Sequence, residues 1–230
     1  MENLFPLNGK IPSPAWVPKK ALYPGSLFAA YSRRIRREVF FVYSVEFLFF
    51  LMVEFHPEVL WFVEHYPKIF LNIYNKKVTT TFDMLIRHKS KDFLLFEVKS
   101  KGFKDFDSPQ IQRQRFFSET FSIPYKIIIE DMIDKNTILI SNLKKLIGYV
   151  AWDVKPNLKS QILNFIYSSK QAEIRQVTEH FHQITENELY TGIVHLIHDG
   201  DIKAPLHKYE FNKSMVLSVE GEGHESEFPF

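Results

Sequence analysis

The chain places two acidic residues and a lysine near the ends of two apolar, strand-like segments. The segments, residues 79–86 and 93–99, flank a polar Lys-Ser-Lys turn, and a hairpin with this three-residue loop sets Asp83 opposite Glu97. Lys99 follows Glu97 by two residues and therefore shares its face of the sheet. Facing carboxylates repel each other unless a cation lies between them, so the pattern predicts a site for a hard metal ion such as Mg²⁺. The lysine would orient a water molecule or steady a phosphate.

A third acidic residue, Glu46, lies inside the apolar run 39–53. The second half of this run is hydrophobic all round, which predicts a buried helix entered from a strand. A carboxylate in such a helix needs a partner or a metal ion. The run is too short for a comfortable membrane span, and an acid at its centre is costly in lipid, so we predict a core helix.

The segment after the hairpin predicts a crossover to a parallel strand. A helix over residues 108–121 opens with a capping serine and a proline at its first position, and Pro124 lies just beyond its end. Residues 125–130 then form a short, buried strand. A strand–helix–strand unit of this length adds a parallel strand beside residues 93–98 through a right-handed crossover. The expected fold class is α/β, with a mixed sheet flanked by helices.

The order of Glu46, Asp83 and Glu97-Val98-Lys99 resembles the PD-(D/E)xK nuclease superfamily, in which an acid on the first helix joins the Asp and Glu-x-Lys of a hairpin. Within that superfamily, roughly residues 30 to 135 resemble TnsA, the endonuclease subunit of heteromeric cut-and-paste transposases. The resemblance implies a restriction-endonuclease-like sheet. It is carried by Tyr43-Ser44-Val45-Glu46, Val63-Glu64-His65-Tyr66-Pro67, Thr81-Phe82-Asp83, Phe96-Glu97-Val98-Lys99 and Ile123-Pro124-Tyr125-Lys126-Ile127-Ile128.

The resemblance implies a metal-dependent endodeoxyribonuclease that cuts the non-transferred strand at the 5′ ends of a transposon in double-stranded DNA. Asp83, Glu97, the Val98 carbonyl and Glu46 would hold Mg²⁺, for which Mn²⁺ can substitute, and Lys99 would complete the catalytic set. The implied partners are a TnsB-like recombinase and a TnsC-like ATPase.

Two other functions stay open on the sequence. One is a different PD-(D/E)xK nuclease, such as a restriction or junction-cleaving enzyme that reads its own target. The other is a non-catalytic adaptor that uses a nuclease-like scaffold to bind DNA and partners. The complete set of Glu46, Asp83, Glu97 and Lys99 argues against the adaptor.

Positive charge is concentrated toward the amino terminus, although the net charge of the chain is only +2. Four arginines, Arg33, Arg34, Arg36 and Arg37, precede the Glu46 helix. They are candidates for neutralising DNA phosphates beside the metal site, and a solvated basic turn is the alternative. Arg113 and Arg115, on the helix after the hairpin, are further candidates of the same kind.

The carboxy-terminal part predicts a winged helix-turn-helix, which also matches TnsA-like proteins. Three amphipathic patterns over residues 158–168, 172–182 and 185–198 are followed by a predicted hairpin of residues 202–203 and 209–211. The third helix has no Lys or Arg and carries two glutamates near its start. A helix without cations is poorly suited to DNA, so we expect this domain to dock proteins.

The expected organisation is an extended arm (residues 1–30), a nuclease domain (31–155), a winged-helix domain (156–217) and an acidic disordered tail (218–230). The chain has no cysteine and no signal-peptide pattern. These features and the resemblance favour a cytoplasmic bacterial protein without a membrane association. His195 and His198 are expected to be structural histidines, because no cysteine or ordered acid accompanies them as a zinc ligand.

Overall fold

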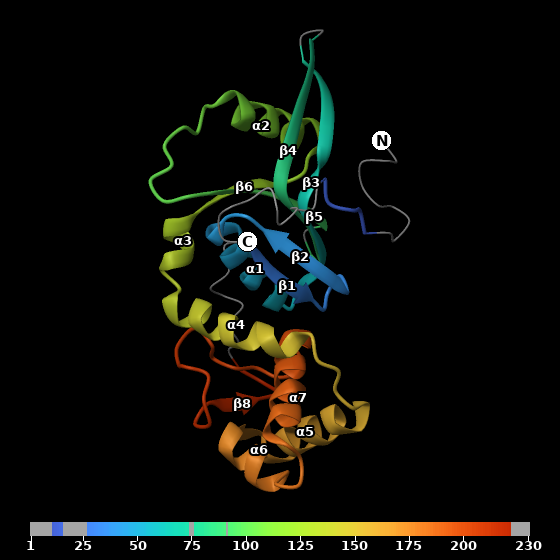
Figure 1. Ribbon diagram of the computed structural model, residues 1–230, viewed down its shortest axis with the longest axis vertical. Helices are drawn as coiled ribbons and strands as arrows, with labels where there is room; N and C mark the ends of the chain where they lie inside the picture. The colour runs from blue at the N-terminus through green and yellow to red at the C-terminus, as the bar shows by residue number, and fades with distance from the viewer. Residues whose placement is uncertain (1–10, 16–26, 74–75, 91, 222–230) are drawn as a thin grey trace. The chain divides into compact units, whose positions relative to one another are not determined.

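The computed structural model describes residues 11–15, 27–73, 76–90 and 92–221 (Figure 1). It divides into two compact units, and the chain passes between them more than once. One unit comprises residues 1–29, 34–49 and 58–133, and the other comprises 30–33, 50–57 and 134–230. The fold is mixed α/β, so the expected class is confirmed at this level. Among the described residues, no helix has the length and apolar character to cross a membrane.

The first unit contains a four-stranded sheet in the order β3-β4-β5-β6. Its strands are antiparallel except for β5 and β6, which are parallel, so the predicted mixed sheet and crossover are confirmed. Its elements, together with the two strands and the helix that precede the sheet, are β1 (Phe28–Ser32), β2 (Arg37–Phe41), α1 (Ser44–Phe55), β3 (Val59–Ile73), β4 (Lys76–His88), β5 (Asp92–Lys99), α2 (Pro109–Phe121), β6 (Tyr125–Ile129) and α3 (Glu130–Asp134).

The hairpin of β4 and β5 has the predicted register. His88 pairs with Asp92 across the loop, and pairing continues to Met84 opposite Phe96. Asp83 and Glu97 occupy the next position in the same register. The backbone pairing stops there, and the Val98 amide donates a 2.7 Å hydrogen bond to Asp83 Oδ2. The end of the hairpin therefore holds the predicted pair of acids.

Helices pack against this sheet, as expected from their apolar faces. Strand β2 leads into α1, which confirms the predicted strand-to-helix entry, and Phe49 of α1 packs on Phe96 of β5 with 5.1 Å between ring centroids. Helix α2 begins with Ser108 as its N-cap, whose Oγ accepts a hydrogen bond from the Ile111 amide. Phe117 of α2 packs against Phe82 of β4.

The second unit contains most of the carboxy-terminal helices. Residues 202–203 and 209–211 do not form the predicted hairpin. Instead β8 pairs with β7, and Lys203 forms an isolated bridge with Ser218. The elements of this part are α4 (Thr137–Val150), α5 (Pro156–Ser169), β7 (Gln171–Glu173), α6 (Ile174–His180), α7 (Glu186–Asp199) and β8 (Val216–Ser218).

The hairpin prediction is wrong because a side chain of α4 binds the backbone of the segment. Asn142 is fully buried, and its Nδ2 donates to the carbonyls of Leu206 and Tyr209, both at 2.7 Å. Its Oδ1 accepts a 2.8 Å hydrogen bond from the Phe211 amide. Backbone groups that bind an amide side chain are not available for a strand ladder. Helix α4, which precedes Pro156, therefore packs as part of this compact unit.

We expect Asn142→Ala to lower the free energy of unfolding by about 3 kcal/mol, because it leaves backbone donors and acceptors without partners. Chemical denaturation followed by circular dichroism measures the effect. Ser141→Ala is the matched control, since Ser141 is the exposed neighbour on the same helix. A loss for Asn142→Ala no larger than that of the control would show that these hydrogen bonds contribute little.

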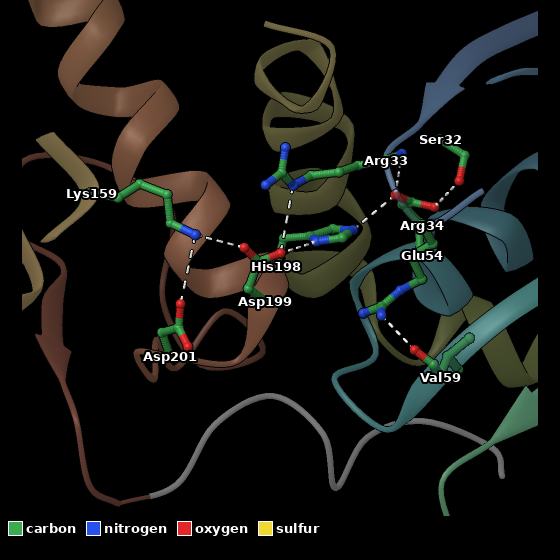
Figure 2. A network of polar contacts seen from close by, with 9 residues as sticks. All are labelled: Ser32, Arg33, Arg34, Glu54, Val59, Lys159, His198, Asp199 and Asp201. Carbon is green, nitrogen blue, oxygen red and sulfur yellow. Dashed lines mark hydrogen bonds and ion pairs between the residues drawn. The ribbon is translucent and has the colours of Figure 1, made fainter. Parts of the chain in front are cut away.

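A buried carboxylate, Glu54 of α1, anchors a polar network in the second unit (Figure 2). It accepts hydrogen bonds from Ser32 Oγ at 2.6 Å and from the Arg33 amide at 2.9 Å. His198 of α7 lies between two carboxylates, with Nε2 2.8 Å from Glu54 Oε1 and Nδ1 3.0 Å from Asp199 Oδ1. A buried carboxylate with this many donors is compensated, so its role is to fix the elements that carry the donors.

The predicted terminal segments lie largely outside the described residues. This applies to 1–10 and 16–26 of the predicted arm and to 222–230 of the predicted acidic tail. Within the arm, the Ala15 amide donates a 2.7 Å hydrogen bond to the His65 carbonyl, and β1 begins at Phe28. Ser218, at the start of the predicted tail, belongs to β8.

Candidate active site

The predicted catalytic residues line one pocket of the first unit. The pocket has a volume of ≈ 430 Å³. Helix α1 contributes Glu46 from its first turn, β4 contributes Asp83, and β5 contributes Glu97, Val98 and Lys99. Glu46 and Lys99, more than fifty positions apart in the chain, thus line one pocket where β4 and β5 stop pairing.

Glu97 is held from three directions. It is 1% exposed, and its Oε1 accepts a 2.8 Å hydrogen bond from Gln110 Nε2 and one from Lys99 Nζ. Its Oε2 accepts from Gln114 Nε2. Gln114 is itself fixed, because Tyr125 donates a 2.7 Å hydrogen bond to its Oε1. The carboxylate therefore has a set orientation before any ligand arrives.

The two glutamines and the tyrosine were missed by the sequence reasoning. Gln110 and Gln114 are four residues apart on α2 and therefore lie on the same face of that helix. This spacing was a usable signal, because polar residues on the face that meets a sheet need partners there. Tyr125 begins β6 and carried no comparable signal. The prediction of a buried strand here is wrong, because Ile128 is its only buried residue and Lys126 is exposed.

Burial and neighbouring charges raise the pKa of two of the acids, Glu46 and Asp83. Burial, with the neighbouring Glu97 carboxylate, raises the pKa of Glu46 from 4.5 to about 7. Burial and the charges of Glu97 and Glu46 raise the pKa of Asp83 well above 3.8, against the lowering effect of the Val98 amide and Lys99. The site therefore holds more negative potential than its single lysine neutralises.

The donor set suits a hard cation. Glu46 Oε2 is buried and has no hydrogen-bond partner, which is a costly state for a carboxylate oxygen. Carboxylate oxygens and a backbone carbonyl such as that of Val98 are the ligands that Mg²⁺ prefers. Among the described residues, no group of three or more His, Cys, Asp or Glu side chains is placed so that it could hold a metal ion, so the fit to a cation rests on the chemistry of the donors. A cation would relieve the repulsion among these acids, so the residues fit the predicted metal.

A second hollow adjoins the site beside β3. It has a volume of ≈ 270 Å³ and shares Tyr43, Glu46 and Asp83 with the first pocket. His65 belongs to residues 63–67, one of the segments that carry the sequence resemblance. It also lines this hollow, and its Nε2 lies 3.1 Å from the Phe40 carbonyl. Burial lowers the pKa of His65, so a neutral ring is favoured at this position.

The arginine cluster before α1 is largely engaged in the fold. Arg37 donates through both terminal nitrogens to the buried carboxylate of Glu64, a bidentate pair. Arg34 donates to the Val59 carbonyl, as Figure 2 shows. Arg33 Nε lies 3.5 Å from Asp199 Oδ1.

Arg36 is the member of the cluster with an exposed side chain, and its φ of 53° marks the turn between β1 and β2. The prediction that the cluster contacts DNA stays a prediction, and Arg36 is its best-placed member. On α2, Arg113 donates to the carbonyls of Pro109 and Thr79, while Arg115 pairs with Asp107 at 3.2 Å.

The histidines of α7 are buried, as expected for structural residues. His198 belongs to the Glu54 network, and both ring nitrogens of His195 are buried without a hydrogen-bond partner. Burial lowers the pKa of His195 to about 4, so its ring is neutral at ordinary pH.

No protein-family model matches this chain, and no curated protein matches it.

The raised pKa of Glu46 predicts a pH-dependent stability of the metal-free protein. A group whose pKa is higher in the folded state adds stability that is complete below its unfolded value near 4.5 and is lost as pH rises through about 7. We expect the melting temperature in chelator to fall between pH 5 and pH 8, and to fall less in Glu46→Gln. Glu119→Gln is the control, because Glu119 is an exposed acid on α2. An unchanged pH slope in Glu46→Gln would contradict the prediction.

Proposed function

We propose that this protein is a Mg²⁺-dependent DNA endonuclease, the subunit of a heteromeric cut-and-paste transposase that cuts the non-transferred strand at transposon ends. One observation carries the proposal. Glu46, Asp83, Glu97 and Lys99 share a single pocket at the end of a hairpin in a mixed sheet flanked by helices. A restriction-endonuclease-like sheet would place an acid of the first helix and the hairpin acids together in this way.

In this proposal Asp83, Glu97, the Val98 carbonyl and Glu46 hold the metal. Bound there, Mg²⁺ would neutralise charge on the scissile phosphate and lower the pKa of a water molecule. Gln110 and Gln114 keep the Glu97 carboxylate oriented. Lys99, with 21% of its side chain exposed, donates to the attacking water or to a phosphate oxygen as negative charge develops there. The products would carry 5′-phosphate and 3′-hydroxyl ends.

Residues 156–217 are proposed to form a winged-helix domain that docks protein partners. Helix α7, the candidate third helix, has two glutamates in its first turn. Glu186 pairs with Lys213 at 3.1 Å, and Glu188 pairs with Lys155 at 3.6 Å. Helix α7 itself has no Lys or Arg to meet DNA phosphates, which favours docking to a TnsB-like recombinase or a TnsC-like ATPase over groove reading.

A cleavage assay with the purified full chain tests the activity. The substrate is a supercoiled plasmid that carries candidate transposon ends, incubated with Mg²⁺, Mn²⁺, Ca²⁺ or EDTA, with and without a TnsB-like recombinase and a TnsC-like ATPase. We expect nicks with Mg²⁺ or Mn²⁺ at the 5′ ends of the element, with 5′-phosphate termini. DNA binding without nicking under every condition would favour the adaptor, and cleavage at a sequence unrelated to transposon ends would favour a self-targeting nuclease.

A further inference from the structure

Strands β3 and β4 continue as a two-stranded ribbon past the rest of the sheet (Figure 1). The pairing of β4 with β5 covers Met84 to His88, whereas the segment from Lys76 to Thr80 pairs with β3 alone among the described strands. Helix α2 braces the base of the ribbon, because Arg113 Nη1 donates a 3.1 Å hydrogen bond to the Thr79 carbonyl. The ribbon is therefore attached to the body of the unit at a fixed place.

The two faces of the ribbon differ in character. Ile69, Leu71 and Thr80 are buried, and the first two join the hydrophobic core of the unit. Residues that alternate with these along each strand point to the opposite face of the ribbon. Phe70 is 76% exposed, and Lys68, Asn72 and Lys77 are exposed as well.

The exposed face forms a continuous surface across both strands. Phe70 pairs with Thr79, and Asn72 pairs with Lys77, so these side chains are cross-strand neighbours on one face. Phe70 thus adds an exposed aromatic ring to a face that otherwise carries lysines and an amide.

The ribbon carries positive charge without any acid to balance it. No Asp or Glu occurs between Glu64 and Asp83, whereas Lys68, Lys76 and Lys77 lie in that interval and are exposed. An unbalanced cationic surface of this kind is complementary to phosphates.

The same face leads along β4 to the candidate active site. From Lys77 to Asp83 every second residue of β4 is accessible or partly accessible, while Thr80 and Phe82 are buried. Thr81 and Asp83 both line the hollow that contains Glu46. Lys77 precedes Asp83 by six residues, which is about 20 Å along a strand. A polymer lying on the ribbon would therefore extend toward the carboxylates.

We propose that the exposed face of the β3–β4 ribbon binds duplex DNA and delivers it to the carboxylate site. A two-stranded ribbon fits the major groove. Lys68 and Lys77 would contact phosphates, Asn72 would reach base edges, and Phe70 would make apolar contact with bases such as the thymine methyl. This inference rests on the proposed function for the identity of the ligand. It assigns DNA binding to the ribbon residues 68–80, none of which is a proposed metal ligand.

The test measures duplex binding by the full chain in EDTA, where no cleavage occurs. The probe is a fluorescent duplex of mixed sequence, titrated at several salt concentrations. We expect Lys68→Ala/Lys77→Ala to weaken binding about tenfold and to reduce the slope of log K against log salt by about 2. Phe70→Ala should weaken binding several-fold and leave the slope unchanged, because a phenyl ring contacts no phosphate. Lys135→Ala/Lys144→Ala, two exposed lysines of the other unit, is the matched control.

Thermal melts check that each variant folds, which is expected because the altered side chains are exposed. Duplex binding by the ribbon variants equal to that of the control would overturn the proposal and leave the ribbon as a surface for a protein partner. Absence of duplex binding by the wild-type chain at low salt would overturn it too. If the ribbon variants lose binding, and the wild-type chain binds DNA but does not cleave it with any of the metal ions, the ribbon proposal stands and the proposed nuclease function fails. If the wild-type chain cleaves and the variants bind and cleave as well as it does, the nuclease stands and the ribbon fails.

Discussion

Asp83→Ala and Glu97→Ala are each expected to abolish Mg²⁺-dependent nicking, with a loss of about 10³-fold or more, while the protein stays folded. Each change removes one of the facing carboxylates and so relieves repulsion in the metal-free protein. Burial first, and then the charges of Glu97 and Glu46, raise the pKa of Asp83. Plasmid nicking gives the activity, and thermal melts in EDTA give the stability.

Glu119→Ala is the matched control for these variants, because Glu119 is an exposed acid of α2 outside the pocket. Glu97→Ala also removes the acceptor for Gln110 and Gln114, so Glu97→Gln is measured beside it to separate lost hydrogen bonds from lost charge. A large fall in melting temperature for Asp83→Ala would mark this acid as structural. Nicking at the wild-type rate in either alanine variant would remove that residue from the site.

Lys99→Ala is expected to lower the cleavage rate by about 10²-fold or more with DNA binding nearly unchanged. One lysine is a small part of an interface with phosphates, but Lys99 lies in the pocket and contacts the buried Glu97. Single-turnover cleavage at saturating protein separates the rate from the affinity, which a binding titration in EDTA measures independently.

Lys101→Ala is the closest control for Lys99. Lys101 lies two residues further along and pairs with Asp131 at 3.2 Å with 69% of its side chain exposed. We expect it to cleave normally. A Lys99→Ala variant that cleaves like Lys101→Ala would exclude Lys99 from the chemistry, whereas equal losses of rate and affinity would make it a DNA-binding residue.

The hairpin, the buried helix and the crossover were predictable because each depends on the pattern of residues close together in the sequence. Alternation and a short polar turn determined the register of β4 and β5, and this register places Asp83 opposite Glu97. A serine and a proline determined the start of α2. These signals act between residues close in sequence, so the chain alone was sufficient to locate the three hairpin residues of the candidate site.

The sequence could not show which polar side chains bind each other over long separations. Glu97 is oriented by Gln110 and Gln114 of α2, whose meeting with β5 depends on how the helix packs on the sheet. Arg37 appeared as a candidate for phosphate contact, yet it pairs with Glu64 of β3. A charge pattern records how many cations a segment has, and only the tertiary structure decides which carboxylates lie within reach.

The prediction of a carboxy-terminal hairpin was wrong for the same physical reason. Residues 202–203 and 209–211 have a strand-like composition, but a short segment pairs as a strand only if no better partner meets its backbone. Asn142, more than sixty residues earlier, binds that backbone instead. The sequence by itself determined the helices, the register and the acids of the candidate site. Tertiary packing decided the partners of those acids and the fate of the weak strands, because hydrogen-bond partners distant in sequence become neighbours only when the chain is folded.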